Sequence, residues 1–135
     1  MPLAPPLRVR PDPAELARVR ERVAGWADAC GLPEGKARRL VLAVDETVAN
    51  AIEHGMGEGR RVVVSAQAGR RRLTVTVRYR GARFDPLAAP ALDRADALRQ
   101  RAAHGYGLHL IRSLADEAAY RWDGGVNEVR LTAEA

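Results

Sequence analysis

Hydrophobic residues in the first part of the chain recur every three to four positions, which is the period of an amphipathic helix. The first such segment runs from Asp12-Pro13 to Gly31. Asp12 is a favourable N-cap, Pro13 suits the first helical position, and glycine commonly ends a helix. The apolar stripe consists of Leu16, Val19, Val23, Trp26 and Cys30. We therefore expect one helix here, with Trp26 and Cys30 in the core or at a dimer interface rather than at a ligand.

A second helix is predicted from Pro33 to Gly55. Within it, residues 40–55 (LVLAVDETVANAIEHG) separate into two faces at about 100° per residue. The apolar face carries Val41, Val44, Val48, Ala51 and Ile52. Glu46 and Asn50 fall on the polar face, four positions apart, so that one lies above the other. Arginine is common elsewhere but absent from this stretch, which favours one wall of a site over an ordinary solvated surface.

A period of two follows, which is typical of strands. Residues 73–79 alternate Leu, Val, Val and Tyr with polar side chains, and residues 62–66 form an apolar, β-branched run before a turn predicted at residues 68–70. Residues 119–132 read as a terminal hairpin around a Gly-Gly turn, and residues 7–10 as a short edge strand. These segments predict a sheet with one buried face.

Residues 81–104 form a long connection of mixed character, and a helix is expected over residues 107–115. Long connections in small domains are more often functional than structural. The resulting order of elements, α-α-β-β-loop-α-β-β, predicts an α+β fold. It is a two-layer sandwich with the helices on one face of a mixed, mostly antiparallel sheet. At 135 residues, the chain is expected to form a single domain over residues 1–135.

Composition narrows the classes of function. The net charge of +5 comes from arginine, since Lys36 is the only lysine, and the arginines are spread along the chain. Two tryptophans, three tyrosines and one phenylalanine offer little surface for stacking bases. A nucleic-acid binder therefore rests on charge alone and ranks last among the hypotheses. The single cysteine excludes an intramolecular disulfide and a cysteine-based zinc site.

Targeting signals are not evident in the sequence. Apolar runs all fall well short of the roughly 18 residues that a membrane-spanning helix needs. The start, Met-Pro-Leu-Ala-Pro-Pro, lacks the basic and apolar regions of a signal peptide. We therefore expect a cytoplasmic protein that does not contact a membrane.

Three features share an order along the chain that calls for one explanation. Glu46 and Asn50 lie on one helix, Gly81 follows a strand, and residues 104–108 (HGYGL) open a helix. A Gly-x-Gly at a helix start lets backbone N–H groups approach an anion, with the helix dipole behind them. Together these features resemble the GHKL (Bergerat-fold) ATPase superfamily and, within it, the bacterial anti-sigma factor/serine-threonine protein kinase family.

The resemblance covers about residues 8–132, which would be the ordered core. Residues 45–55 (DETVANAIEHG) resemble the N box, residues 84–87 (FDPL) the segment after the G1 box, and residues 105–111 (GYGLHLI) the G2 box. Residues 120–127 are similar to the family's last hairpin. The resemblance implies that Asn50 binds the Mg²⁺ that bridges the phosphates of ATP. It also implies that Glu46 is the general base toward a hydroxyl nucleophile.

The same resemblance assigns the remaining groups. Residues 86–104 would form the ATP lid, and Gly81, with Tyr79, would lie at the base of the nucleotide. The phosphate-binding residues would be Gly105, Tyr106, Gly107 and Leu108. The implied activity is phosphorylation of a serine or threonine on an anti-anti-sigma (STAS-domain) partner, together with sequestration of a sigma factor. The family also suggests a homodimer.

One position departs from the family pattern. Tyr79 stands where the G1 box has the aspartate that accepts the adenine amino group. A phenol can accept a hydrogen bond or stack on a base, but it lacks the fixed charge of a carboxylate. Loss of a hydrogen bond to a charged acceptor costs on the order of 1.5–3 kcal/mol. The alternative hypothesis is therefore a protein-binding module that keeps the fold but has a degenerate ATP site.

Overall fold

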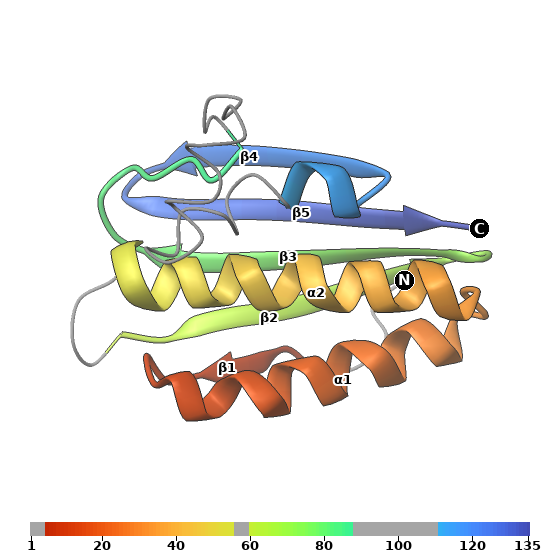
Figure 1. Ribbon diagram of the computed structural model, residues 1–135. Helices are drawn as coiled ribbons and strands as arrows, with labels where there is room; N and C mark the ends of the chain where they lie inside the picture. The colour runs from red at the N-terminus through yellow and green to blue at the C-terminus, as the bar shows by residue number, and fades with distance from the viewer. Residues whose placement is uncertain (1–4, 56–59, 88–110) are drawn as a thin grey trace, which may run out of the picture.

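The computed structural model describes residues 5–55, 60–87 and 111–135. Its sheet has five strands in the order β1-β2-β3-β5-β4 (Figure 1). The strands are β1 (Leu7–Val9), β2 (Val62–Gly69), β3 (Arg72–Arg80), β4 (Glu117–Asp123) and β5 (Val126–Glu134). Each pairing among these strands is antiparallel. The described sheet is therefore antiparallel throughout, rather than mixed, because every connection among its neighbouring strands reverses the chain direction.

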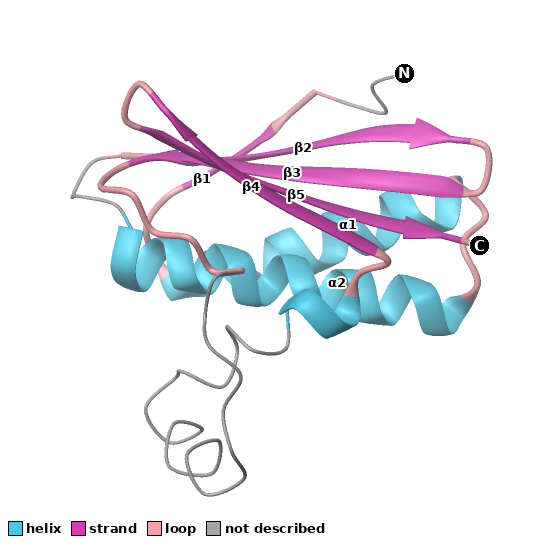
Figure 2. Ribbon diagram, turned by 90° about the horizontal axis from the view of Figure 1, so that it is seen from above, coloured by secondary structure: helices cyan, strands magenta, loops and turns pink. Residues whose placement is uncertain are grey.

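Two long helices pack on one side of this sheet (Figure 2). They are α1 (Leu16–Ala29) and α2 (Glu34–Asn50). The Asp12 side chain is an N-cap, as predicted, but it caps the 3₁₀ turn η1 (Pro13–Glu15) that precedes α1, accepting the N–H of Ala14 at 2.9 Å. Gly31 ends that helix region with φ +76°, a conformation that glycine adopts without a Cβ clash. None of the helices in the described ranges is long and apolar enough to cross a membrane.

The core lies between the two layers. Alternate residues of β3, beginning at Leu73 and ending at Tyr79, are buried against the helices, as their period of two predicts. Val19, Val23 and Trp26 of α1 are buried on the facing side, and Cys30 packs at the edge of the core. The predicted two-layer α+β architecture is thus confirmed.

Both tight hairpins turn on two residues. Gly124 and Gly125 join β4 to β5 with φ +57° and +81°, in agreement with the predicted turn. The β2–β3 turn lies further along the chain than predicted, because Gly69 pairs with Arg72 and leaves Arg70 and Arg71 in the turn. Arg71 has φ +54°, so a non-glycine residue takes the left-handed conformation at this turn.

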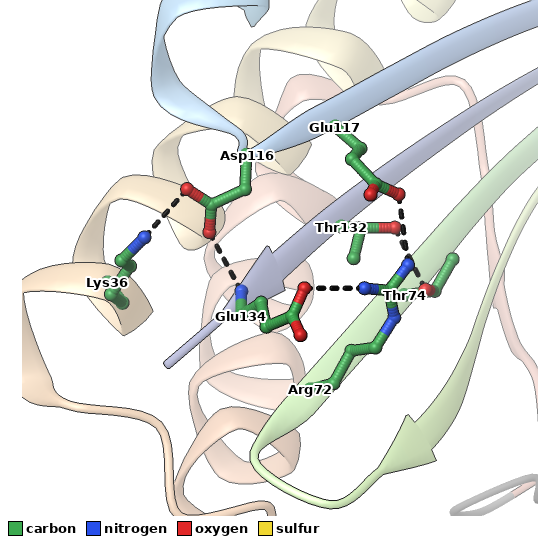
Figure 3. Close-up of polar contacts among 7 residues, drawn as sticks. All are labelled: Lys36, Arg72, Thr74, Asp116, Glu117, Thr132 and Glu134. Atoms are coloured by element: carbon green, nitrogen blue, oxygen red, sulfur yellow. Dashed lines mark hydrogen bonds and ion pairs between the residues drawn. The ribbon is translucent and has the colours of Figure 1, made fainter.

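A network of polar side chains ties the start of α2 to the far end of the sheet (Figure 3). Lys36 Nζ lies 2.6 Å from Asp116 Oδ1, and Asp116 Oδ2 accepts the backbone N–H of Glu134 at 2.8 Å. Arg72 pairs with Glu134 at 2.6 Å and with Glu117 at 2.9 Å. At this end of the sheet, each of these charged side chains has a partner of opposite sign.

Candidate functional site

The C-terminal end of α2 carries Glu46 and Asn50, the two residues predicted to act together. Asp45, next to them, is held by Arg20 of α1 at 2.8 Å. Glu46 is half-buried, whereas Asn50 is only 3% exposed. The helical period places Asn50 on the polar face of α2, and the structure buries this side chain. Helix α2 packs against β5 and β3, and the turn that follows it contacts β3.

The Asn50 carboxamide is buried without being satisfied. Its Nδ2 atom has no hydrogen-bond partner among the residues that the structure describes. Buried polar groups nearly always have a partner, because leaving one unpaired forfeits its hydration without return. The amide can also be rotated to place Oδ1 at this position, since the two orientations have the same shape. The site thus offers an unused amide donor or oxygen acceptor to a ligand.

The helix changes its winding directly after Asn50. Residues Ala51–Gly55 form a single π turn, labelled η2. Single π turns within or at the end of α-helices are frequent at functional sites, because they widen the helix and redirect its side chains. The predicted helix end at Gly55 is therefore confirmed, but its last turn is wider than an α-helix.

The other wall of the site is the loop that leaves β3. Gly81 donates its backbone N–H to the carbonyl of Gly125 at 3.0 Å. Its own carbonyl accepts the indole N–H of Trp122 at 3.2 Å. Gly81 is thus fixed to the β4–β5 hairpin on both sides of its peptide. This anchoring holds the loop at the end of the sheet where the turn between β4 and β5 also lies.

Asn127 clamps the same loop. Its side chain is fully buried, with Oδ1 accepting the N–H of Phe84 at 3.1 Å and Nδ2 donating to the carbonyl of Ala82 at 3.0 Å. The Tyr120 hydroxyl donates to Asn127 Oδ1 and also lies 3.1 Å from the Phe84 nitrogen. Sequence analysis did not identify Asn127. The available signal was a polar residue at an inward-facing position of a strand, where an apolar one is expected.

The loop after β3 continues to Leu87, which contacts a residue on the far side of residues 88–110. Asp85 Oδ1 accepts the N–H of Leu87 at 2.8 Å, and Pro86 is buried. Arg112, in the helical residues 111–114, donates to the carbonyl of Leu87 at 3.2 Å. The residues just before and just after residues 88–110 are therefore joined to each other.

Tyr79 belongs to the core on the helix side of β3 and is only 3% exposed. Burial raises the pKa of its phenol well above the usual range, and the neighbouring Tyr120 and Asp85 add to this rise. The hydroxyl is therefore protonated and uncharged at neutral pH. Asp85 uses its carboxylate within its own turn, as the contact with Leu87 shows. Position 79 therefore carries a neutral phenol where the family resemblance leads one to expect a carboxylate.

The sequence matches a known protein family over nearly its whole length. The model of the family described as "Histidine kinase-like ATPase domain" matches residues 9–133. The chain belongs to this family. The predicted membership of the GHKL group is thereby confirmed, and the histidine kinase-like ATPase domain accounts for nearly the whole chain.

Two similar proteins refine the comparison. The chain is 26% identical over 98 residues to the serine/threonine-protein kinase BtrW of Bordetella bronchiseptica, an alignment that covers 71% of this chain and 69% of BtrW. The crystal structure of the RsbU and RsbW domains of Rv1364c from Mycobacterium tuberculosis superposes with a TM-score of 0.66 at 23% identity. That match covers 97% of this chain but 32% of the solved one, and it shows a common fold.

The histidine kinase-like ATPase domain described here contains part of the predicted site. Glu46 and Asn50 lie in the last turns of α2, Tyr79 lies near the end of β3, and Gly81 directly follows that strand. Strand β3 also contacts η2. The predicted phosphate-binding residues Gly105, Tyr106, Gly107 and Leu108 lie outside the described residues, as do residues 88–104 of the predicted lid. The residues that fix the loop after β3 are Tyr120, Trp122 and Asn127.

Proposed function

We propose that this domain binds Mg-ATP and phosphorylates a serine or threonine on a protein partner. The observation that carries the proposal is the buried, unpartnered carboxamide of Asn50, four residues after Glu46 on α2. Membership of an ATPase domain family and similarity to the kinase BtrW support it. A buried carboxamide without a partner is unfavourable in the protein alone, and a ligand that completes it explains its presence.

The residues present fit a magnesium nucleotide at the phosphate end. With its amide turned so that Oδ1 takes the unpartnered position, Asn50 would supply one oxygen, which is a hard ligand suited to Mg²⁺. Among the described residues, no group of three or more His, Cys, Asp or Glu side chains is placed to hold a metal ion. Protein sites for Mg²⁺ commonly supply one or two ligands and leave the rest to substrate phosphates and water. When Mg-ATP is bound, ATP would supply the phosphoryl group, and Mg²⁺ would supply the positive charge that neutralises the phosphate oxygens.

The chain's own residues would then position the acceptor. Glu46 would accept the proton of the serine or threonine hydroxyl, as a general base within hydrogen-bond reach. Gly105 and Gly107 would direct backbone N–H groups toward phosphate at a helix start. Residues 86–104 would close over the nucleotide and exclude water, with Leu87 and Arg112 holding the two ends together. Positioning of this kind provides most of the protein's part in phosphoryl transfer.

The proposed partners follow from the resemblance to the anti-sigma factor family. The substrate would be an anti-anti-sigma protein of the STAS type, and this domain would itself sequester a sigma factor. Both events would take place in the bacterial cytoplasm, where the protein would regulate transcription. A homodimer would present two such surfaces to the sigma factor.

Phosphoryl transfer tests the proposal directly. The purified domain would be incubated with a STAS-domain protein encoded near it and with ATP labelled at the γ-phosphate. Glu46→Gln keeps the size of the side chain but cannot accept the proton, so transfer should fall by roughly 10²-fold or more. ATP affinity should remain within a few-fold of wild type. Transfer by Glu46→Gln at the wild-type rate would remove Glu46 as the base.

A second function has its own supporting observation. Tyr79 is buried and neutral where a nucleotide site of this family needs a charged acceptor. This favours a domain that binds its protein partner without nucleotide. Under this alternative, Tyr79→Asp should create or sharply improve ATP binding, with Tyr79→Phe as the control that restores no charge. Wild-type ATP binding unaffected by Tyr79→Asp would count against it.

A further inference from the structure

The sheet face that points away from the helices contains a hollow of about 340 Å³. It lies where β2 begins, β3 ends and β5 begins. Its lining includes Arg60, Arg61, Val63, Arg78, Arg80 and Val126. Both long helices lie on the opposite side of the sheet, so the hollow is separated by the sheet from the helix face that carries Asn50 (Figure 2).

The charge of this hollow is unusual for the end of a sheet. Four of its lining residues are arginines and none is acidic. Glu128 is the nearby carboxylate, paired with Arg121 at 2.9 Å and only loosely with Arg78 at 3.9 Å. Arg60 and Arg80 have no carboxylate partner among the described residues. Like charges gathered on one sheet face repel one another and reduce stability.

At the opposite end of the same sheet, an arginine is paired with carboxylates. There, Arg72 lies between Glu117 and Glu134 and pairs with both (Figure 3). At this end of the sheet, two carboxylates neutralise the charge of Arg72. At the end that holds the hollow, positive charge is in excess. Local features that oppose stability without compensation often mark functional sites.

We propose that this hollow binds a compact phosphate-bearing anion. The planar guanidinium group donates two parallel hydrogen bonds to phosphate oxygens, which gives arginine its preference for this ligand. A phosphate monoester carries about −1.5 to −2 charge at pH 7. It can therefore neutralise the charge of more than one arginine, whereas a single carboxylate neutralises one. The small volume and the two valines suit a compact ligand.

The lining argues against a nucleic acid as the occupant. Single-stranded nucleic acids bind through aromatic side chains on which bases stack. The aromatic residue of this lining is Tyr79, which is buried at 3% exposure. The hollow therefore recognises the phosphate group and offers no platform for a base.

Calorimetric titration with inorganic pyrophosphate at low ionic strength, without Mg²⁺, tests this site. Arg78→Gln/Arg80→Gln should weaken binding by roughly tenfold or more, because it removes two charged forks from the hollow. Arg130→Gln is the matched control, since Arg130 is an exposed arginine of β5 outside this hollow. Asn50→Ala separates the hollow from the proposed nucleotide site. Both single variants should bind within about twofold of wild type.

Several results would overturn the proposal. The first is absence of saturable pyrophosphate binding, and the second is binding by the double variant at wild-type strength. The third is an equal loss of affinity in Arg130→Gln, which would reveal a general charge effect. Loss in Asn50→Ala alone would place pyrophosphate in the nucleotide site. A phosphoserine peptide titrated in parallel distinguishes a protein-borne phosphate from a free one. Tighter binding of an oligo-aspartate or a single-stranded oligonucleotide than of either phosphate ligand would contradict phosphate as the recognised group.

Discussion

The buried carboxamide of Asn127 accepts the backbone N–H of Phe84 at 3.1 Å, across 43 positions of sequence. The same side chain donates to the carbonyl of Ala82 at 3.0 Å. Asn127, in the last strand, therefore forms hydrogen bonds with both a backbone donor and a backbone acceptor of the loop that follows β3. Because this loop leads to the proposed nucleotide lid, its shape depends on a side chain far away in the sequence.

Replacing Asn127 tests this dependence. Asn127→Ala leaves the Ala82 carbonyl without its amide donor and the Phe84 N–H with only the Tyr120 hydroxyl as acceptor, so the free energy of unfolding should fall by about 2–4 kcal/mol. Tyr120→Phe removes one hydroxyl from the same cluster and should cost only about 0.5–1.5 kcal/mol. Urea denaturation of the three proteins measures both effects. An Asn127→Ala protein as stable as Tyr120→Phe would show that the clamp contributes little.

The pair of Lys36 and Asp116 predicts a pH dependence of stability. The hydrogen bond from Lys36, then the backbone N–H of Glu134, holds the pKa of Asp116 below its ordinary value of 3.8. A lowered folded-state pKa means that the stabilisation is present above the unfolded pKa and is lost as the pH falls through the folded one. Asp116→Asn should therefore cost up to about 1 kcal/mol at pH 7, a modest value because the pair is partly exposed.

Urea unfolding of wild type and Asp116→Asn across pH 7 to about pH 2.5 measures this difference. The two stabilities should converge as the pH falls below the lowered folded-state pKa of Asp116, where the wild-type carboxyl group becomes protonated. In a Lys36→Gln background, the effect of Asp116→Asn at pH 7 should shrink, since the two residues are coupled. A stability difference that stays constant over the whole pH range would contradict the assigned cause.

Arg71 gives a prediction of increased stability. It holds φ +54° in the β2–β3 turn, a conformation that is unfavourable for residues with a Cβ atom. Arg71→Gly removes this strain and should raise the free energy of unfolding by about 0.5–1 kcal/mol, after allowance for the greater freedom of glycine in the unfolded chain. Arg71→Ala is the control, because it removes the same exposed side chain and keeps the strain. Equal stability of the two variants, by thermal or urea unfolding, would argue against strain at this residue.

Much of the fold could be predicted from local pattern. The alternation from Leu73 to Tyr79 gave the strand and its buried face, and Asp12 gave the start of the first helix region. These features depend on residues close together in the chain. The turn at Arg70 and Arg71 could not be predicted in the same way, because Gly69 is the stronger turn signal but is itself the last paired residue of β2, opposite Arg72.

The site was predicted less completely, for a physical reason. Helical period placed Glu46 and Asn50 on one face, but it could not reveal that Asn50 is buried where the end of α2 packs against β3. The role of Asn127 depends on hydrogen bonds to residues more than 40 positions away. Pattern analysis detects the polar residue in an apolar position, while its partners are known only from the tertiary structure.

The most direct test of the central claim is titration of the purified domain with ATP, with and without Mg²⁺, beside Asn50→Ala. The account predicts saturable binding that requires Mg²⁺ and that weakens by about tenfold or more in Asn50→Ala, since the variant lacks the carboxamide oxygen proposed to hold the metal. Thermal unfolding of the two proteins without ligand confirms that the variant is folded. Absence of binding up to millimolar ATP, or binding of equal strength in Asn50→Ala, would contradict the claim that the end of α2 forms a magnesium nucleotide site.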